Sequence, residues 1–388
     1  MSVFQKSVLI TDGYARQTLP MARSFHELGC RVTVLCFSKS DVGYLTKYAD
    51  RHILMQCEKD DYGKQTEEVR ALLKTGEYEL VVPMTDYSAI YLAENKPEFS
   101  QYAYIAVNDK KSFDLAIDKI NTMRICAENG IPAPKTLFSA EPLKDIDASG
   151  LEYPLVVKPR TACGSIGFSI IHDRGQLERA LESYDAENGP LFIQEYIPQN
   201  GSQFGAEAFR DRNGRFASVL INEKPRWFPL DGGSPTINMT IHDEKMHRMA
   251  QELLDAMDWN GYANIDFVKD CRTGEPKIIE INGRISAAAK LNFRAGVDIG
   301  RLILENAFAD EITCYDSYPD HVKTSCCLTE LLWFLKSPNR FCTKPSVFNR
   351  KNNRDVIFSW RDIRPFFGFC LQSVRNYKHA MQKRRRVE

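Results

Sequence analysis

The chain has 388 residues, 43% of them hydrophobic, which is enough to bury a large core, and we expect two or three domains. Its 51 basic and 51 acidic residues leave no net charge, so bulk charge gives no support for binding to nucleic acid. No apolar run approaches the roughly 18 residues of a membrane span, and the first residues lack the apolar segment of a signal peptide. The eleven cysteines are scattered without a C-x-x-C pair, so we expect free thiols in a reducing cytoplasm.

Residues 1–112 alternate short apolar strands with helical segments, which predicts a doubly wound α/β domain with a parallel sheet. The expected strands are residues 8–11, 32–36, 80–83 and 105–107. No G-x-G-x-x-G follows the first strand, so a dinucleotide site there has no support. Asp86 follows the third strand, where α/β sheets present ligands, and it is a candidate substrate contact. The alternative is that Asp86 caps the next helix.

A strand, a small-residue loop and a returning strand follow a predicted amphipathic helix at 113–130. The first strand, 155–159, carries Lys158, and the loop contains Gly164, Ser165 and Gly167. Backbone N–H groups of such a loop can fold over a phosphate chain, and Lys158 would add a positive charge. The lysine precedes the glycines, so this is not the G-x-x-x-x-G-K-[ST] loop, and an ordinary hairpin is the alternative.

A further predicted strand, 191–197, carries Glu195, Tyr196 and Ile197 and ends at Pro198. Adenine is commonly held by backbone groups at such a hinge. The alternative is an edge strand that ends at a proline.

Two carboxylates and an amide are expected to converge near residue 280. Asp266 lies in one apolar run, Glu280 and Asn282 lie at the end of a second, and a Gly-containing polar turn separates the runs. Paired antiparallel strands would bring the three side chains together, with 280 and 282 on one side. Oxygen-only ligands suit Mg²⁺ bound together with phosphates. The alternative is an exposed strand face with solvated acids.

The order of these motifs resembles the ATP-grasp superfamily, with the closest likeness to the carbamoyl-phosphate-synthase-like carboxylate–amine ligases. The likeness is strong over about 113–308, looser over 1–112 and absent from about 311. It implies an N-terminal doubly wound pre-ATP-grasp domain (1–112) and an α+β ATP-grasp domain with antiparallel sheets (113–310, with a small lid subdomain at about 136–196). A helical extension with a basic tail is expected over 311–388.

The resemblance also implies roles for single residues. It implies that Lys119 and Lys158 contact the phosphates of ATP, under the loop that contains Gly164, Ser165 and Gly167. It implies that Glu195 and the backbone around Tyr196 and Ile197 hold adenine, and that Gln203 stands where a ribose-binding glutamate is common. Glu207 is a possible substitute for that glutamate.

For the metal, the resemblance implies that Asp266, Glu280 and Asn282 bind two Mg²⁺, with Mn²⁺ as a substitute. Arg284 would stabilise the transferring phosphoryl group, so Arg284, Lys158 and Glu280 are the expected catalytic residues. The usual Asn-Pro-Arg carries Gly283 in place of proline, which is expected to loosen the backbone before the arginine.

The implied activity is an ATP-dependent ligase that activates a carboxylate as an acyl phosphate and couples it to an amine. Arg226 is the candidate for binding a substrate carboxylate, with a solvated surface arginine as the alternative. A non-catalytic nucleotide-binding scaffold and an enzyme with a non-amine acceptor also stay open. The expected partners are small molecules in the cytoplasm, without nucleic acid; the sequence leaves a homodimer open.

The C-terminal residues predict a helix with an apolar stripe at three- and four-residue steps, from Ile363 through Phe366 and Phe367 to Tyr377. Asp362 is expected to cap it. Residues 375–388 carry six Lys and Arg against one Glu, so contact with an anionic membrane at the inner surface is one interpretation. The other is a stripe packed on the core, followed by a solvated tail.

Overall fold

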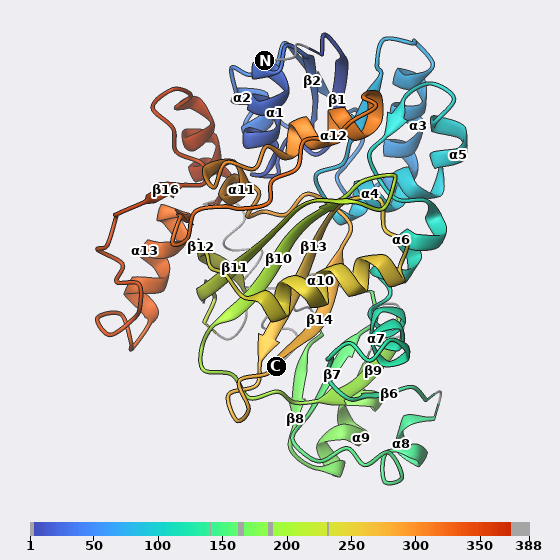
Figure 1. Ribbon diagram of the computed structural model, residues 1–388, viewed down its shortest axis with the longest axis vertical. Helices are drawn as coiled ribbons and strands as arrows, with labels where there is room; N and C mark the ends of the chain where they lie inside the picture. Colours follow the sequence, from blue (N-terminus) through green and yellow to red (C-terminus); the bar gives the residue numbers. More distant parts are fainter. Residues whose placement is uncertain (1–3, 140, 162–166, 185–188, 231–232, 374–388) are drawn as a thin grey trace.

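The computed structural model describes residues 4–139, 141–161, 167–184, 189–230 and 233–373. Three sheets organise this part of the chain (Figure 1). A parallel sheet with helices lies at the top of the view, a long antiparallel sheet crosses the middle, and a small sheet with two helices lies at the bottom. The predicted α/β fold class is confirmed.

The N-terminal sheet is parallel, with the strand order β3-β2-β1-β4-β5. The chain runs outward from β1 to β3 and then returns to the other side of β1, so β1 and β4 flank the point where the strand order reverses. Ligands bind at the carboxyl ends of such strands. The strands are β1 (Ser7–Ile10), β2 (Arg31–Cys36), β3 (Arg51–Leu54), β4 (Leu80–Val82) and β5 (Tyr104–Ile105). The helices are α1 (Thr18–Glu27), α2 (Val42–Leu45), α3 (Tyr62–Leu73), α4 (Asp86–Glu94) and α5 (Lys96–Phe99).

The small sheet covers the residues expected to form the lid, and its strand order is β6-β9-β7-β8. All of its pairs are antiparallel, and β7 and β8 are the predicted strands on either side of the small-residue loop. The elements are β6 (Thr136–Leu137), α8 (Pro142–Asp145), β7 (Leu155–Pro159), β8 (Ser169–Ile171), α9 (Arg174–Glu182) and β9 (Leu191–Glu195).

The long sheet has the strand order β14-β13-β10-β11-β12-β15-β16, and only its last pair is parallel. Its strands are β10 (Gln203–Arg210), β11 (Phe216–Phe228), β12 (Ser234–Thr240), β13 (Gly261–Lys269), β14 (Pro276–Asn282), β15 (Lys323–Ser325) and β16 (Asn353–Asp355). The helices between these strands in the chain are α10 (Glu244–Ala256), α11 (Lys290–Arg294), α12 (Ile299–Phe308) and α13 (Cys327–Lys336).

Alternation along the strands gives the long sheet one apolar and one polar face. Ala206, Ile265 and Phe267 are fully buried and join the apolar residues of α10 in one core cluster. Their neighbours Gly205 and Asp266 therefore point to the other face, because side chains alternate along a strand. The sheet thus presents its polar residues to a cleft.

The C-terminal segment was expected to be helical, and that expectation is wrong in one respect: it also adds β15 and β16 to the long sheet. Residues 364–373 are helical, as predicted. Asp362 is buried and accepts hydrogen bonds from Thr46 Oγ1 and the Lys47 backbone, so its described contacts hold the segment to the N-terminal domain. Phe366 and Phe369 pack on a small core around Cys326 and Val356. The predicted basic tail at 375–388 lies outside the described residues.

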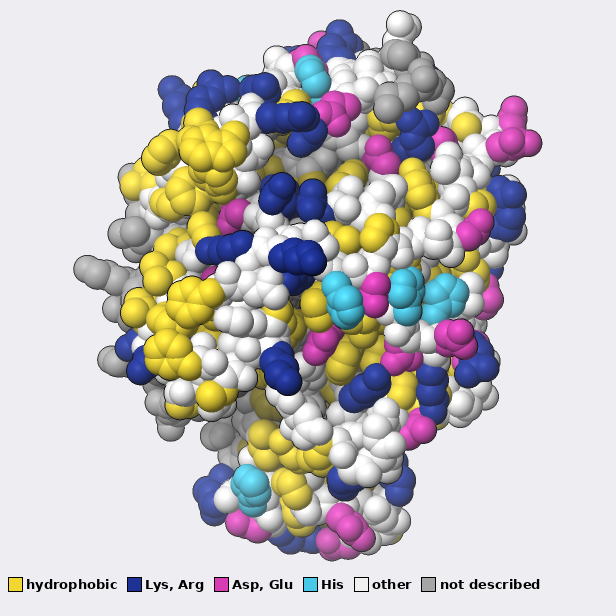
Figure 2. All heavy atoms as spheres, turned by 60° about the vertical axis from the view of Figure 1, so that its left-hand side comes forward, with side chains coloured by type: hydrophobic (Ala, Val, Ile, Leu, Met, Phe, Trp, Pro, Cys, Tyr) yellow, Lys and Arg dark blue, Asp and Glu magenta, His cyan; other side chains and the backbone are white. Residues whose placement is uncertain are grey.

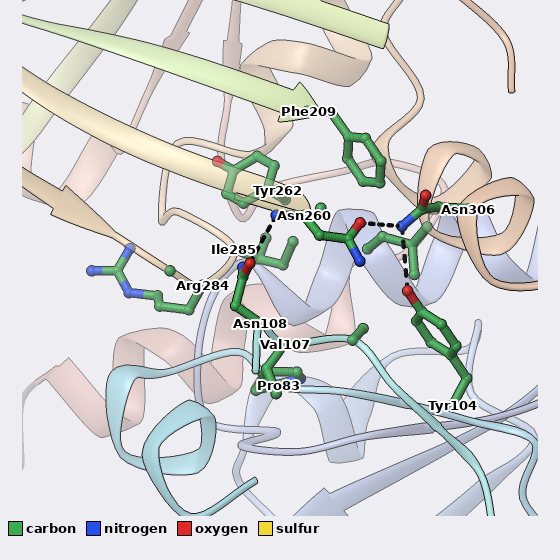
Figure 3. Close-up of a pocket in the computed structure, with 14 residues that line it drawn as sticks. Pro83, Tyr104, Val107, Asn108, Phe209, Asn260, Tyr262, Arg284, Ile285 and Asn306 are labelled. Atoms are coloured by element: carbon green, nitrogen blue, oxygen red, sulfur yellow. Dashed lines mark hydrogen bonds between the residues drawn. The ribbon is translucent and has the colours of Figure 1, made fainter. Parts of the chain in front are cut away.

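A small cavity of about 30 Å³ marks the junction of the N-terminal sheet with the long sheet (Figure 3). Asn306 Nδ2 donates to Tyr104 Oη (3.3 Å) and to Asn260 Oδ1 (3.0 Å), and the Asn260 backbone N–H donates to Asn108 Oδ1 (2.8 Å). The space is about right for a water molecule, so we assign this cavity a structural role. The ten described cysteines are free, and no described helix has the length and hydropathy to span a bilayer.

Candidate active site

A cleft of about 890 Å³ runs between the small sheet and the polar face of the long sheet. Its wall includes Lys158 from the small sheet and Asp266 from the long sheet. Arg16 from the N-terminal domain also contributes, as do Leu328 and Leu332 on α13. The cleft therefore joins residues from all parts of the described chain, and most of the predicted site residues line it.

Lys119 reaches this cleft because the predicted helix over 113–130 breaks. The structure has two helices there, α6 (Lys110–Ile117) and α7 (Lys119–Glu128), and Asp118 caps the second by accepting from Ile120 N. Asp118 also pairs with Arg160, just after β7, and the Lys119 backbone N–H donates to Arg160 O (3.0 Å). The break fixes Lys119 at the first turn of α7, where its Nζ lies 3.5 Å from Glu280 Oε2.

Lys158 lies on β7 with its ammonium 5.2 Å from the centre of the Phe192 ring. Burial lowers the pKa of Lys158 to about 8; Glu280 works against this shift and Lys119 adds to it. Burial makes the charged form of Lys158 less stable than it is in water. A nearby anion such as a phosphate would stabilise that charged form.

Asp266 and Glu280 lie directly opposite each other on β13 and β14, and Asn282 lies opposite Asn264. The predicted hairpin and its register are therefore present. Burial raises the pKa of Asp266, with the Glu280 charge adding to the effect and Lys224 opposing it. Burial also opposes ionisation of Glu280, but Lys119 and Lys158 outweigh it and hold the pKa of Glu280 below its usual range. Two adjoining carboxylates with opposite pKa shifts form a site that a cation would stabilise.

Lys224 partly neutralises this pair, and Gly205 makes room for it. Its Nζ forms an ion pair with Asp266 Oδ1, although β10 lies between the two strands that carry them. A Cβ atom on Gly205 would lie 3.1 Å from Lys224 Nζ and 3.2 Å from its Cε, so a side chain there would crowd the lysine. The glycine thus lets a cation from β11 reach the acid on β13.

The donor set fits Mg²⁺. Asp266 and Glu280 supply carboxylate oxygens on facing strands, and both line the cleft with Asn282. Asn282 Nδ2 is 3.3 Å from Asp266 Oδ2, so the amide nitrogen is turned toward Asp266 and its oxygen is left to face elsewhere. Mg²⁺ prefers hard oxygen ligands, and proteins usually bind it through one or two carboxylates together with the phosphates of a substrate.

Arg284 follows β14, the strand that carries Glu280 and Asn282, and its Nε lies 3.2 Å from Asp86 Oδ1. Figure 3 shows its guanidinium pointing away from the junction cavity. Asp86 is the first residue of α4 and Thr85 is its N-cap, so the alternative that Asp86 caps the helix is wrong, and its contact with a substrate stays a prediction. Gly283 is tightly packed rather than loose, because a Cβ there would lie 2.8 Å from Trp259 and 3.0 Å from Phe113.

The predicted adenine hinge also lines the cleft, through Glu195, Tyr196, Ile197 and Gln203. The Glu195 carboxylate is already engaged: it pairs with Lys277 and accepts from Lys135 N (2.9 Å). Both of these contacts are to Oε1, and the Glu195 backbone N–H donates to Lys135 O (2.9 Å). Gly167 has φ +72°, a conformation that favours glycine, while Gly164 and Ser165 lie outside the described residues.

Glu207 does not serve as the substitute for a ribose ligand. It is fully buried, and it accepts hydrogen bonds from Tyr262 Oη, Asn264 Nδ2 (3.2 Å) and Ser286 Oγ (2.8 Å). Burial raises the pKa of Glu207 to about 7, while the Ser286 hydrogen bond opposes the shift. Its oxygens are occupied inside the protein.

The prediction that Arg226 binds a substrate carboxylate is also wrong. Its guanidinium is buried and forms a two-point ion pair with Glu330 on α13, at 2.8 and 2.6 Å. Its remaining nitrogen donates to Pro345 O (2.6 Å), and its guanidinium carbon lies 5.1 Å from the Trp333 ring centre. The alternative of a solvated surface arginine is equally wrong. Arg226 attaches the C-terminal segment to β11 and is not available to a substrate.

Arg16, like Lys224, is a cationic residue of the cleft that the sequence analysis did not single out. It lies after β1, is half-buried and lines the cleft together with Arg284 and Ser286. In the described part of the chain its side chain has no hydrogen-bond or ion-pair partner. Its place near the β1–β4 reversal was the available signal, since α/β sheets bind ligands there.

Residues 116–288 match the family profile described as the ATP-grasp domain. The chain is 26% identical over 252 residues to D-aspartate ligase of Enterococcus faecium (strain Aus0004), covering 58% of each protein. It is 28% identical over 249 residues to the N-terminal section of the carbamoyl phosphate synthase large chain of Methanopyrus kandleri, covering 61% of this chain and 40% of that one. The chain thus spans less than two thirds of either relative.

The fold is similar to that of biotin carboxylase from Campylobacter jejuni, with a TM-score of 0.67 and 19% identity. The match covers 82% of this chain and 74% of the other. The likeness to biotin carboxylase concerns the fold alone, while the profile identifies residues 116–288 as a member of the ATP-grasp superfamily.

Proposed function

We propose that this protein is an ATP-dependent ligase that activates a substrate carboxylate as an acyl phosphate and joins it to an amine. The observation that carries the proposal is the convergence of Lys119, Lys158, Glu280 and Arg284 with Asp266 around one cleft. The similarity to D-aspartate ligase supports a carboxylate–amine reaction and favours an amino acid as one of the two substrates.

The chemistry requires two anions to meet. A carboxylate oxygen attacks the γ-phosphorus of ATP, and the bond from that phosphorus to the ADP oxygen breaks. Lys158 and Lys119 bind the phosphates, and Arg284 stabilises the charge that builds on the transferring group. Mg²⁺ held by Asp266, Glu280 and Asn282 would supply further neutralisation of the phosphate oxygens. The amine then attacks the acyl carbon, phosphate leaves, and the amine loses a proton.

Arg16 is our candidate for the substrate carboxylate, in place of Arg226. Its fork can bind a carboxylate in two-point geometry, and its guanidinium lines the same cleft as Arg284. Trp227, Leu328 and Leu332 give the same cleft apolar lining. A substrate with a carboxylate at one end and an apolar or small body fits this lining.

The test uses amino acids labelled with ¹⁸O in the carboxylate, each incubated with the full chain, Mg²⁺ and ATP. Attack by the carboxylate leaves one ¹⁸O in the released phosphate, which mass spectrometry detects. Hydroxylamine added in place of the amine should trap the acyl phosphate as a hydroxamate. ATP binding without ADP formation across a panel of D- and L-amino acids, hydroxy acids and sugar acids would favour the scaffold alternative. Unlabelled phosphate released in step with product would contradict the acyl phosphate.

A further inference from the structure

The C-terminal segment carries the most exposed large hydrophobic side chains of the described chain. Trp360 is 85% exposed, Phe341 73% and Phe348 70%. The members of this C-terminal apolar surface are Leu331, Leu335, Phe341, Phe348, Trp360, Phe367 and Leu371. Figure 2 shows hydrophobic side chains gathered on this side of the molecule, with Lys and Arg beside and between them. Concentrated exposure of this kind marks a contact surface.

The surface rests on an ordered base. Phe334 packs edge-on against both Phe341 and Phe348, with ring centres 5.5 and 5.6 Å apart. A second aromatic group joins Phe358 to Trp360 (4.8 Å) and to Phe366 (5.4 Å). The Arg226–Glu330 pair ties α13, which carries Leu331 and Leu335, to the long sheet. The exposed rings are therefore held outward by packing beneath them.

The charges around this surface are almost all positive. Residues 331–373 contain eight Lys and Arg and only two acids, Asp355 and Asp362. Both acids are used inside the protein: Asp355 accepts from the backbone of Cys327 and Ile357, and Asp362 accepts from Thr46. The structure shows no ion pair for any of the eight cations within the described residues. They are Lys336, Arg340, Lys344, Arg350, Lys351, Arg354, Arg361 and Arg364.

We propose that the C-terminal apolar surface docks on an anionic lipid bilayer. Tryptophan and phenylalanine enter the headgroup boundary favourably, and unpaired Lys and Arg bind lipid phosphates. A second copy of the chain fits less well, because a two-fold contact would bring the same cations together, and residues 331–373 contain no exposed acid to pair with them. Nucleic acid fits less well because Leu331, Leu335 and Leu371 offer no stacking surface to bases.

The first test is co-sedimentation of the full chain with vesicles of phosphatidylcholine alone and with one quarter phosphatidylglycerol. We expect binding to the anionic vesicles only. Trp360→Ser/Phe341→Ser should weaken it at least about tenfold, and so should Arg350→Glu/Lys351→Glu. The matched controls, Phe138→Ser and Lys74→Glu/Lys111→Glu, alter exposed residues elsewhere and should bind normally. Circular dichroism melts check that every variant folds.

A second measurement locates the contact. Brominated anionic lipids should quench the fluorescence of the protein, and Trp360→Phe should remove most of that quenching because Trp360 is 85% exposed whereas Trp259 and Trp333 are buried and Trp227 is half-buried. Equal binding to both vesicle types, no binding, or binding unchanged by the surface variants would overturn the proposal. So would retention of an oligonucleotide, or dimer formation, that these variants abolish while vesicle binding is absent.

Discussion

Lys224 and Arg226 lie two residues apart on β11, and each pairs with a carboxylate from another element, yet the two pairs lie in opposite surroundings. Arg226 and Glu330 are sealed from solvent, matched in geometry, and have further hydrogen bonds to Pro345 and Thr236. Lys224 faces a crowded cluster in which Asp266 adjoins a second acid, Glu280. A satisfied pair holds structure together, whereas a cluster with surplus charge beside a cleft is suited to bind charged ligands.

The largest effect should come from breaking the sealed pair. Glu330→Ala leaves the buried Arg226 guanidinium without its carboxylate, and we expect a loss of about 3–5 kcal/mol in the free energy of unfolding. Urea denaturation followed by circular dichroism measures it. The control is Arg226→Met/Glu330→Leu, which removes both charges and should lose much less. A Glu330→Ala protein as stable as the parent would show that the C-terminal segment is not held by this pair.

In the cleft, Glu280→Gln keeps the volume but removes a charge that faces Lys119 and that the proposed Mg²⁺ would need. We expect turnover of ATP to fall by about two orders of magnitude or more, while the protein still folds. Phosphate release at saturating Mg²⁺ and ATP measures the rate. Near-normal turnover would remove Glu280 from the proposed site. The parent enzyme should lose activity when a chelator is added and recover it in Mg²⁺ or Mn²⁺. Glu280→Gln should show no such recovery.

The pKa of Lys158, about 8, predicts how nucleotide binding depends on pH. Lys158 is charged below that pKa and neutral above it, and phosphates bind the charged form. ATP affinity should therefore fall as pH rises through about 8, by up to about tenfold per pH unit. Calorimetry from pH 6.5 to 9.5 measures it. Lys158→Arg should flatten the profile, since the guanidinium keeps its charge; an unchanged profile would mean that another group titrates.

The smallest effect concerns substrate recognition. Arg16→Ala should raise the KM for the carboxylate substrate by about tenfold and leave the affinity for ATP unchanged, because in the proposed reaction Arg16 binds the substrate carboxylate and not the nucleotide. Arg16→Lys should recover part of the loss, since it restores charge without two-point geometry. A fall in kcat at constant KM would instead place Arg16 beside the transferring phosphoryl group.

Sequence alone determined the local features: the alternating N-terminal strands and helices, the hairpin that sets Asp266 opposite Glu280, and the order of the lysine, hinge and acid motifs. These follow from spacing, since strand alternation and turn composition act over a few residues. The same reasoning placed the helix that became α6 and α7, but not the break at Asp118 that puts Lys119 at the cleft.

Only the tertiary structure decided whether Arg226, Glu207 and Arg16 are paired inside the protein or face the cleft. The partners of two of them lie far along the chain: Arg226 meets Glu330, and Glu207 meets Ser286. Arg16 lines the cleft and has no side-chain partner among the described residues. A charged side chain in a sequence carries no sign of whether a distant residue will satisfy it. Burial and pairing depend on packing between elements, and packing is what turned one predicted substrate ligand into a structural anchor.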